Sequence, residues 1–418
     1  MTSIPINASY SSPVPELIKI ELPNGAELYP VRRGTVPALK LELMFPAGRP
    51  YEKKNGLASA TLQLIKGGTQ KKSATRLAEG FDLWGSSLTF DFYVDNCGIK
   101  LFVLEKYLPK VLPLFCEMLT TPSFPATELK LYQRQQKEKL RSDESRGDVI
   151  AYRTFTEQLY GSRHPYGYNS TVESIDAITR EDLFIHYHHN YDIKDCKVFL
   201  SGSFSDETLA LVSKALGSLP ISGNKRTKLK IKTASSKSGD IHIPKEDAVQ
   251  SSIRIGRRLF TRQHPDYIAM YVLNTILGGY YGSRLMQNLR EKKGLTYHIY
   301  SSLDTFLLDG YFLISTEVDK SRKDLAIKEI YRELIRLQEK KVSSAELKTI
   351  KSYLKGSFLN YFENVLAQSE LIRSLTVEGG VAGYLHLLKG IDEITADELQ
   401  HVALKYLCKD DLTLISVG

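Results

Sequence analysis

The order of predicted elements occurs twice along this chain of 418 residues. Each copy begins with an extended stretch and continues with a helix, a Gly-containing turn, a short helix, two neighbouring strands and two longer helices. The extended segments are predicted at 39–45, 87–93 and 98–104 in the first copy and at 251–256, 297–303 and 310–316 in the second. Neighbouring strands followed by paired helices indicate an antiparallel sheet with helices packed on one face. We therefore predict an α+β fold made of two homologous domains.

A segment rich in Ser, Gly, Lys and Thr separates the two copies. We predict a linker at 222–240, an N-terminal domain at 1–221 and a C-terminal domain at 241–418. Much of the formal net charge of +8 lies in this linker. Its lysines do not alternate with aromatic residues and no nucleic-acid motif accompanies them, so we interpret it as solvated and expect no nucleic-acid partner.

The composition is typical of a soluble globular protein, with 42% hydrophobic and 25% charged residues. The four cysteines are far apart and form no Cys-x-x-Cys pair, so we expect isolated thiols rather than a structural zinc knot or a redox motif. No stretch reaches the roughly 18 apolar residues of a spanning helix. The first 20 residues lack a basic region followed by an apolar run, so we expect a cytoplasmic location, or a periplasmic one if a leader has been trimmed.

Short motifs occur in a fixed order along the whole chain. They are Gly56-Leu57-Ala58, Gly68-Thr69, His164-Pro165-Tyr166-Gly167, Ser201-Gly202-Ser203-Phe204, Leu277-Gly278-Gly279, Gly282-Ser283-Arg284-Leu285 and Leu289-Arg290-Glu291-Lys292-Lys293-Gly294-Leu295-Thr296-Tyr297. This series resembles the pitrilysin/insulinase-type zinc peptidases, or inverted zincins. That family includes insulin-degrading enzyme, the mitochondrial processing peptidases and core proteins of a respiratory complex. The resemblance implies that the two domains form one half of a clamshell.

The same resemblance places a zinc site on the helix that opens near Asn55, but the zinc ligands are missing. A catalytic zinc needs three protein ligands and an open position for water. The family supplies them as His-x-x-Glu-His, whose two histidines share a helix face, and a distant Glu. The matching positions here are Ser59, Leu62, Gln63 and Lys139, the last becoming Leu140 if the alignment shifts by one residue. These side chains cannot hold zinc, so we expect no metal in this chain and zinc in a partner subunit.

All nine histidines lie at or beyond His164, outside the helix where the family places its zinc. The one cluster contains His186, His188 and His189. Their spacing does not place all three on one face of a helix, so we interpret them as ordinary helix residues rather than as metal ligands.

An arginine and a tyrosine of the second half match residues that active relatives direct at the substrate. Arg290 and Tyr297 lie seven residues apart, as the family requires. The resemblance implies that Tyr297 hydrogen-bonds the developing oxyanion and that Arg290 holds the substrate backbone. The alternative is that Arg290 is a surface residue beside Glu291 and that Tyr297 is a half-buried strand residue.

The turn that contains Gly278, Gly279 and Gly282 is a further candidate for substrate contact. Glycines let a peptide backbone approach closely, and the mitochondrial relatives have a Gly-rich loop in the substrate path. The alternative is a simple connection between two helices. A phosphate-binding loop is excluded because no Gly-Lys-Ser/Thr follows.

We therefore predict a non-catalytic subunit of a heterodimeric zinc endopeptidase, inactive alone, that completes a chamber around a peptide and supplies Arg290 and Tyr297. The resemblance implies a zinc-binding homologous subunit as the partner, with self-dimerisation as the alternative. The alternative function is a structural or peptide-binding protein similar to the respiratory core subunits. An independent enzyme is disfavoured because no Ser/His/Asp or Cys/His set has an interpretable spacing.

Overall fold

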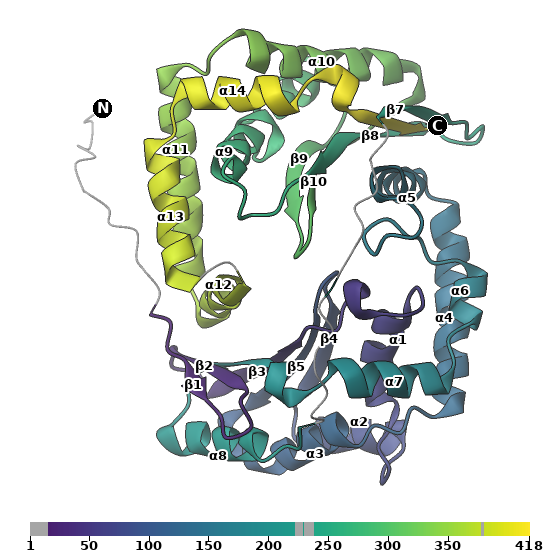
Figure 1. Ribbon diagram of the computed structural model, residues 1–418, viewed down its shortest axis with the longest axis vertical. Helices are drawn as coiled ribbons and strands as arrows, with labels where there is room; N and C mark the ends of the chain where they lie inside the picture. Colours follow the sequence, from purple (N-terminus) through teal and green to yellow (C-terminus); the bar gives the residue numbers. More distant parts are fainter. Residues whose placement is uncertain (1–15, 222–228, 230–237, 378–379) are drawn as a thin grey trace.

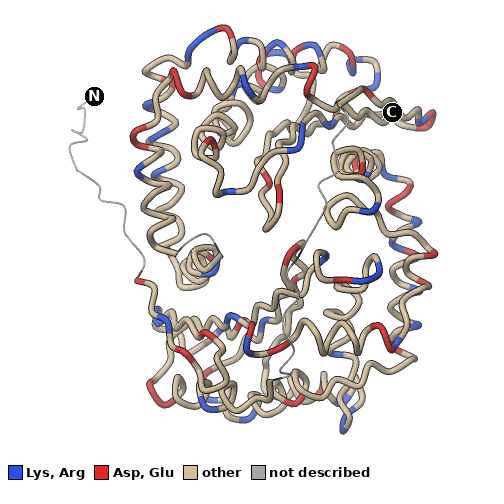
Figure 2. The backbone as a smooth tube through the Cα atoms, viewed as in Figure 1, with Lys and Arg blue, Asp and Glu red and all other residues tan. Residues whose placement is uncertain are grey.

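The computed structural model describes residues 16–221, 229, 238–377 and 380–418. Most of the predicted linker at 222–240 lies outside these residues. The described part forms two sheet-and-helix units that face each other (Figure 1). Basic and acidic residues are interspersed along the described backbone of both units (Figure 2), as on a solvated surface.

The two sheets have the same topology. The first has the order β1-β2-β6-β3-β5-β4 and the second has the order β7-β11-β8-β10-β9. The strands are β1 Ile20–Glu21, β2 Glu27–Arg32, β3 Ala38–Phe45, β4 Ser87–Phe92, β5 Cys97–Leu104, β6 Lys197–Gly202, β7 Gly239–Ile243, β8 Gln250–Leu259, β9 Ile299–Thr305, β10 Gly310–Asp319 and β11 Thr413–Val417. Without β1, the strands of one sheet correspond one to one with those of the other.

The predicted α+β class is confirmed, but each sheet also contains one parallel pair of strands. The pairs β2–β6 and β7–β11 are parallel, whereas the other neighbouring pairs are antiparallel. Each parallel pair joins the first long strand of a unit to its last strand. The strands that the sequence pattern identified are neighbours along the chain, so the pattern could not indicate this pairing.

Fourteen α-helices surround the sheets within the described residues. They are α1 Leu57–Leu64, α2 Ala74–Asp82, α3 Leu108–Thr120, α4 Ala126–Glu144, α5 Gly147–Tyr160, α6 Val172–Asp176, α7 Arg180–Asn190, α8 Asp206–Gly217, α9 Tyr267–Gly278, α10 Lys323–Glu339, α11 Ser344–Leu359, α12 Val365–Val377, α13 Gly380–Glu393 and α14 Ala396–Tyr406. Figure 1 places α3 and α8 on the outer side of the first sheet, and α10 and α14 on the outer side of the second. None of the helices described here has the length and apolar character needed to cross a membrane.

Alternation along the central strands gives each sheet two different faces. In β3, Leu41 and Leu43 are fully buried in the core of the first unit, while Lys40 and Glu42 point to the opposite face. In β10, Phe312 and Ile314 belong to the core of the second unit, whereas Tyr311 and Leu313 belong to a cluster on the opposite face. Each sheet therefore needs a second layer on the face that its own core helices do not cover.

The two units supply this second layer by exchanging helices. Helix α5 of the first unit packs against β8 and β11, and α12 of the second unit packs against β2 and β6. Figure 1 shows both helices lying against the sheet of the opposite unit. The prediction of helices on one face thus describes the core helices of each unit, and the exchanged helices cover the other face.

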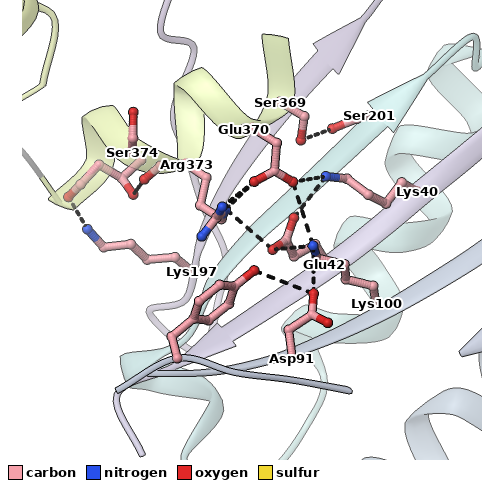
Figure 3. Close-up of polar contacts among 12 residues, drawn as sticks. Lys40, Glu42, Asp91, Lys100, Lys197, Ser201, Ser369, Glu370, Arg373 and Ser374 are labelled. Atoms are coloured by element: carbon pink, nitrogen blue, oxygen red, sulfur yellow. Dashed lines mark hydrogen bonds and ion pairs between the residues drawn. The ribbon is translucent and has the colours of Figure 1, made fainter. Parts of the chain in front are cut away.

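The two exchanged contacts differ in chemistry. Helix α5 presents Phe155, Leu159 and Tyr160 to an apolar cluster that contains Tyr311 and Leu313 of β10. Around α12, three basic and three acidic side chains form one network (Figure 3). Its members are Lys40, Glu42, Asp91, Lys100, Glu370 and Arg373.

The two hairpin turns form a third link between the units. Asp95, in the turn between β4 and β5, accepts hydrogen bonds from the Tyr166 hydroxyl (2.6 Å) and from the Leu307 amide (2.7 Å). Leu307 lies in the turn between β9 and β10. The edge hairpins of the two sheets therefore meet near the middle of the molecule, where the candidate site lies.

The four cysteines, all within the described residues, are free thiols. Cys97 and Cys196 are buried, and Cys116 and Cys408 are partly buried. Burial raises the pKa of Cys97 to about 12 and that of Cys116 to about 11, so these two thiols stay protonated at neutral pH.

Candidate functional site

Helix α1 carries three of the four positions that the sequence resemblance aligns with the zinc site. Leu62 is fully buried in the core of the first unit. Gln63 is half-buried, and its Nε2 donates a hydrogen bond to the Phe90 carbonyl oxygen of β4 (3.3 Å). Ser59 instead faces a cleft that Lys139 of α4 also lines. Ser59 and Lys139 thus line the same cleft, whereas Leu62 packs in the core and Gln63 hydrogen-bonds to the edge strand β4.

The four side chains do not fit a zinc ion. A zinc site needs thiolate, imidazole or carboxylate donors, whereas this set offers one hydroxyl, one amide and a cation. Among the residues that the structure describes, no three His, Cys, Asp or Glu side chains converge to hold a metal. His186 is buried with its Nε2 3.1 Å from the Ala47 carbonyl oxygen, and burial lowers its pKa to about 4. This histidine therefore packs in the core as a neutral side chain.

The cleft at Ser59 and Lys139 has a volume of about 510 Å³. Helices α1, α4 and α5 and several connecting segments of the first unit line it, together with Phe306 and Tyr311 of the second unit. Helix α4 contributes residues at helical spacing, namely Tyr132, Gln136, Lys139, Leu140 and Asp143. Either alignment of the distant zinc ligand, to Lys139 or to Leu140, therefore falls on this cleft.

The start of α1 is fixed by buried polar contacts beside the cleft. Gly56 precedes the helix with φ of +84°, a left-handed conformation that favours glycine. Its amide donates to the Tyr168 hydroxyl (3.1 Å), and the Ala58 amide donates to Glu52 Oε2 (2.9 Å). Burial raises the pKa of Glu52, despite these hydrogen bonds and the charge of Arg49. The Arg49 Cζ lies 4.5 Å from the centre of the Tyr168 ring.

The second candidate region lies in the other unit, where Arg290 and Tyr297 come together. Arg290 belongs to a π-helix, Met286–Lys292, and Tyr297 lies two residues before β9. The Arg290 Cζ lies 5.0 Å from the centre of the Tyr297 ring and 5.1 Å from that of Tyr281. Both distances are typical of cation–π contacts, which hold the guanidinium between two rings.

The Tyr297 side chain is 85% exposed, so it is not the half-buried strand residue of the alternative interpretation. Arg290 is partly exposed, and its Nε lies 3.6 Å from Glu291 Oε1. The same carboxylate oxygen accepts a hydrogen bond from the Tyr281 hydroxyl (2.8 Å). The pair thus combines a positioned cation with an accessible phenol, two donors suited to bind a carbonyl or an oxyanion.

Comparisons with known proteins relate the chain to a family of peptidases. Residues 177–354 match the family model described as the peptidase M16 inactive domain. An uncharacterized zinc protease of Mycobacterium leprae, ML0855, is 26% identical over 85% of this chain and 80% of its own length. The non-peptidase homolog YmxG of Helicobacter pylori is 28% identical over 76% of this chain and 74% of its own.

Two solved structures share the fold over nearly the whole chain. The peptidase M16 inactive domain from Pseudomonas fluorescens superposes with a TM-score of 0.87 at 24% identity, covering 96% of this chain and 98% of that one. A protease from Helicobacter pylori gives 0.88 at 20% identity, covering 97% and 100%.

Residues 177–354 thus resemble the inactive domain of M16 peptidases, and the whole chain shares the fold of such proteins. The positions that the motif resemblance aligns with the zinc site hold Ser59, Leu62, Gln63 and Lys139. The pitrilysin/insulinase-type resemblance found in the motifs is therefore confirmed. The matched family model spans the Arg290–Tyr297 pair and the Gly-rich turn.

Two of the three glycines of that turn, Gly278 and Gly279, are needed for close packing against backbone atoms. A Cβ at Gly278 would lie 2.5 Å from the Ser301 amide nitrogen of β9, and one at Gly279 would lie 2.7 Å from the Thr275 Cα. At Gly282 a Cβ would lie 2.6 Å from the Tyr280 ring. Backbone packing therefore accounts for Gly278 and Gly279, whereas the neighbour of Gly282 is a side chain, which is easier to displace. Their role in substrate contact stays a prediction.

Sequence reasoning missed the side chains that give the cleft its character. Arg49 and Arg153 line it together with Tyr132, Tyr152 and Tyr168. The helical spacing of Tyr132, Gln136 and Lys139 was visible in the sequence. The approach of α5 and of the segment near Tyr168 was not, because it depends on tertiary packing.

Proposed function

We propose that this chain is the non-catalytic half of a two-chain zinc endopeptidase and that it supplies Arg290 and Tyr297 to the shared chamber. The observation that carries the proposal is the Arg290–Tyr297 pair, with its 5.0 Å cation–π contact and its exposed phenol. The pair lies in a chain whose own zinc positions cannot hold the metal. Such a division leaves the metal to a homologous partner with His-x-x-Glu-His.

In the proposed complex, the partner's zinc would polarise the scissile carbonyl and activate the attacking water. Tyr297 would donate its phenolic proton in a hydrogen bond to the carbonyl oxygen as negative charge develops there. Arg290 would hold a neighbouring backbone carbonyl through its guanidinium N–H groups. The aromatic rings of Tyr281 and Tyr297 limit the rotation of Arg290, so less conformational entropy would be lost when the substrate binds.

The substrate class that fits is an extended peptide. Strands β4 and β9 lie at the edges of their sheets, so each has one side without a neighbouring strand among the described residues. An extended peptide can pair with such an edge through main-chain hydrogen bonds. Tyr297 lies two residues before β9, which supports this edge as the one that would present the substrate to the Arg290–Tyr297 pair.

The test compares this chain, a homologous His-x-x-Glu-His chain and their mixture. The partner is sought first in a neighbouring gene, and the readouts are zinc content and cleavage of a quenched fluorescent peptide. We expect this chain alone to be metal-free and inactive, and the mixture to cleave. One zinc per chain together with cleavage by this chain alone would refute the proposal.

The second candidate function is a structural or peptide-binding protein without a role in proteolysis. The description of the Helicobacter pylori relative as a non-peptidase homolog favours it. It predicts that the mixture is no more active than the partner alone and that Arg290 and Tyr297 can be replaced without effect. A self-dimer without zinc, detected by analytical ultracentrifugation, would also agree with this candidate.

A further inference from the structure

The cleft that replaces the metal site is lined by three cations. They are Arg49, Lys139 of α4 and Arg153 of α5. Arg49 interacts electrostatically with Glu52, but no carboxylate of the described residues lies within ion-pair distance of any of the three. Unpaired cations around one cleft form a site for an anion, because a bound carboxylate would interact with several of them at once.

Two of these cations are held in place by the surrounding structure. The Arg49 guanidinium lies over the Tyr168 ring, and its buried Nε has no hydrogen-bond partner among the described residues. Arg153 donates from one guanidinium nitrogen to the Ser170 carbonyl oxygen (2.8 Å) and has further N–H groups. Lys139 is exposed, so its flexible ammonium can adjust to a ligand.

The acidic groups nearby do not cancel this charge. Asp143 is the only carboxyl among the described residues that line the cleft, and it lies 4.0 Å from Arg146. Glu52, beside Arg49, does not line the cleft, and its pKa is raised by burial, which disfavours its ionised form. The lining therefore has an excess of positive charge.

Aromatic side chains form part of the wall of the cleft. Phe92, Tyr132, Tyr152, Tyr166, Phe306 and Tyr311 line it. Aromatic walls exclude water and strengthen the attraction between a carboxylate and the cations. The volume of about 510 Å³ lies within the range of about 300–1,000 Å³ that is typical of ligand pockets. The cleft can therefore enclose one or two residues of a peptide.

We propose that this cleft binds a carboxylate of an extended peptide, at its C-terminus or on an acidic side chain, with a neighbouring apolar side chain against the tyrosines. The proposal rests on the proposed function, since it assumes that peptides are the ligands of this chain. At the place where an M16 peptidase holds zinc to cut a peptide, this chain would hold the carboxylate of one without cutting it.

The experiment measures peptide binding to the full chain alone by fluorescence anisotropy. The probe is a fluorescein-labelled decapeptide with a free C-terminal Phe, compared with its C-terminal amide and with an amide that has an internal Glu. We expect Lys139→Glu to weaken binding of the free-carboxylate peptide at least about tenfold, with a smaller loss for Lys139→Gln. If neither amide binds, the cleft recognises the C-terminal carboxylate. If the amide with the internal Glu binds, the cleft recognises the side-chain carboxylate.

The matched control is Arg141→Glu, which makes the same charge change at an exposed position of α4 outside the cleft. It should alter binding less than twofold, and circular dichroism checks that each variant is folded. Equal affinities for Lys139→Glu and Arg141→Glu, or equal affinities for the free-carboxylate peptide and both amides, would overturn the proposal. The binding assay contains neither partner nor zinc, so its result does not depend on proteolysis. If this chain binds the free-carboxylate peptide selectively but its mixture with the partner does not cleave, only the proposed peptidase role is refuted.

Discussion

The two exchanged helices make equivalent contacts with opposite chemistry. Helix α5 meets the second sheet through fully buried apolar and aromatic side chains such as Phe155. Helix α12 meets the first sheet through a small apolar cluster around Ile372 and through the six-residue charged network (Figure 3). One of the two equivalent helix–sheet contacts is therefore stabilised mainly by hydrophobic burial and the other mainly by paired charges.

The charged network depends on its completeness. Lys40 Nζ lies 2.9 Å from Glu42 Oε2 and 3.2 Å from Glu370 Oε1, and Lys100 Nζ lies 2.7 Å from Asp91. Arg373 pairs with Glu370 and lies 3.6 Å from Glu42 Oε1. With three charges of each sign the network is neutral. Buried charges are tolerated only when paired, so the loss of one member affects all the others.

The stability contributed by the α5 contact should therefore not depend on pH, whereas the stability contributed by the α12 contact should depend on the charges of its members. The hydrophobic effect requires no specific partner, but each charge in the network requires an opposite one. The contacts thus predict different mutational patterns.

The largest effect is expected at the α5 contact. Replacing Phe155, which is fully buried, with Ala removes an aromatic ring and leaves a cavity against the second sheet. The free energy of unfolding should fall by about 3–5 kcal/mol. Urea denaturation measures it. Leu404→Ala, at a position that is 58% exposed, is the control and should change the free energy by less than about 0.5 kcal/mol. A loss at Phe155 no larger than this control would contradict the account.

The next effect is expected at Glu42, which is fully buried in the network. Glu42→Gln leaves the remaining members with a net charge of +1, and we expect a loss of about 2–3 kcal/mol in the free energy of unfolding. The double variant Lys40→Met with Glu42→Leu restores neutrality and should recover much of this loss. A double variant that is less stable than Glu42→Gln would show that charge balance does not govern this contact.

A smaller, pH-dependent effect is expected at Glu370. Burial would raise its pKa, but Arg373, Lys40 and Lys100 together lower it to about 2. Because this pKa lies below the ordinary value of 4.5, the stabilisation is full above about pH 4.5 and is lost as the pH falls toward 2. Glu370→Gln should cost about 1 kcal/mol at pH 6.

The measurement for Glu370 is urea unfolding of the wild type and Glu370→Gln at pH 6 and pH 3. The difference between the two proteins should narrow at pH 3, while the difference between the wild type and Phe155→Ala should stay constant. If the difference in the free energy of unfolding between the wild type and Glu370→Gln is the same at both pH values, the α12 contact is no more pH-dependent than the α5 contact, and the account is contradicted.

The smallest effect on stability is expected at Tyr297. Its side chain is 85% exposed, so Tyr297→Phe should change the free energy of unfolding by less than about 0.5 kcal/mol. Thermal unfolding is sufficient to check this. A large loss would mean that the phenol supports the fold and would weaken its assignment to the substrate.

Local patterns in the sequence predicted the repeated elements well but not the contacts between the units. Alternation along β3 places Leu41 on one face of the strand and Lys40 and Glu42 on the other. Such a pattern is typical of a strand with one face in the core and one face in solvent. The charged residues are buried because Glu370 and Arg373, more than 300 residues away in the chain, cover them. Propensity and periodicity act over short distances and cannot report such a partner.

The candidate site was predictable to a similar extent. The family resemblance matched Ser59 and Lys139 to zinc-ligand positions, and both line one cleft in the structure; it also singled out Arg290 and Tyr297, seven residues apart. It did not predict the second ring against Arg290, because the approach of Tyr281 depends on how the Gly-rich turn packs. Nor did it predict that strand β9 would begin at Ile299 and leave Tyr297 exposed.

The central claim is that this chain contributes Tyr297 to catalysis by a zinc-bearing partner. The most direct measurement is the kcat and KM of the reconstituted pair, with wild-type chain and with Tyr297→Phe. The account predicts that kcat falls about 100-fold while KM changes little, because the phenol acts on charge that develops only in the transition state. An unchanged kcat for a fully assembled pair with Tyr297→Phe would contradict it.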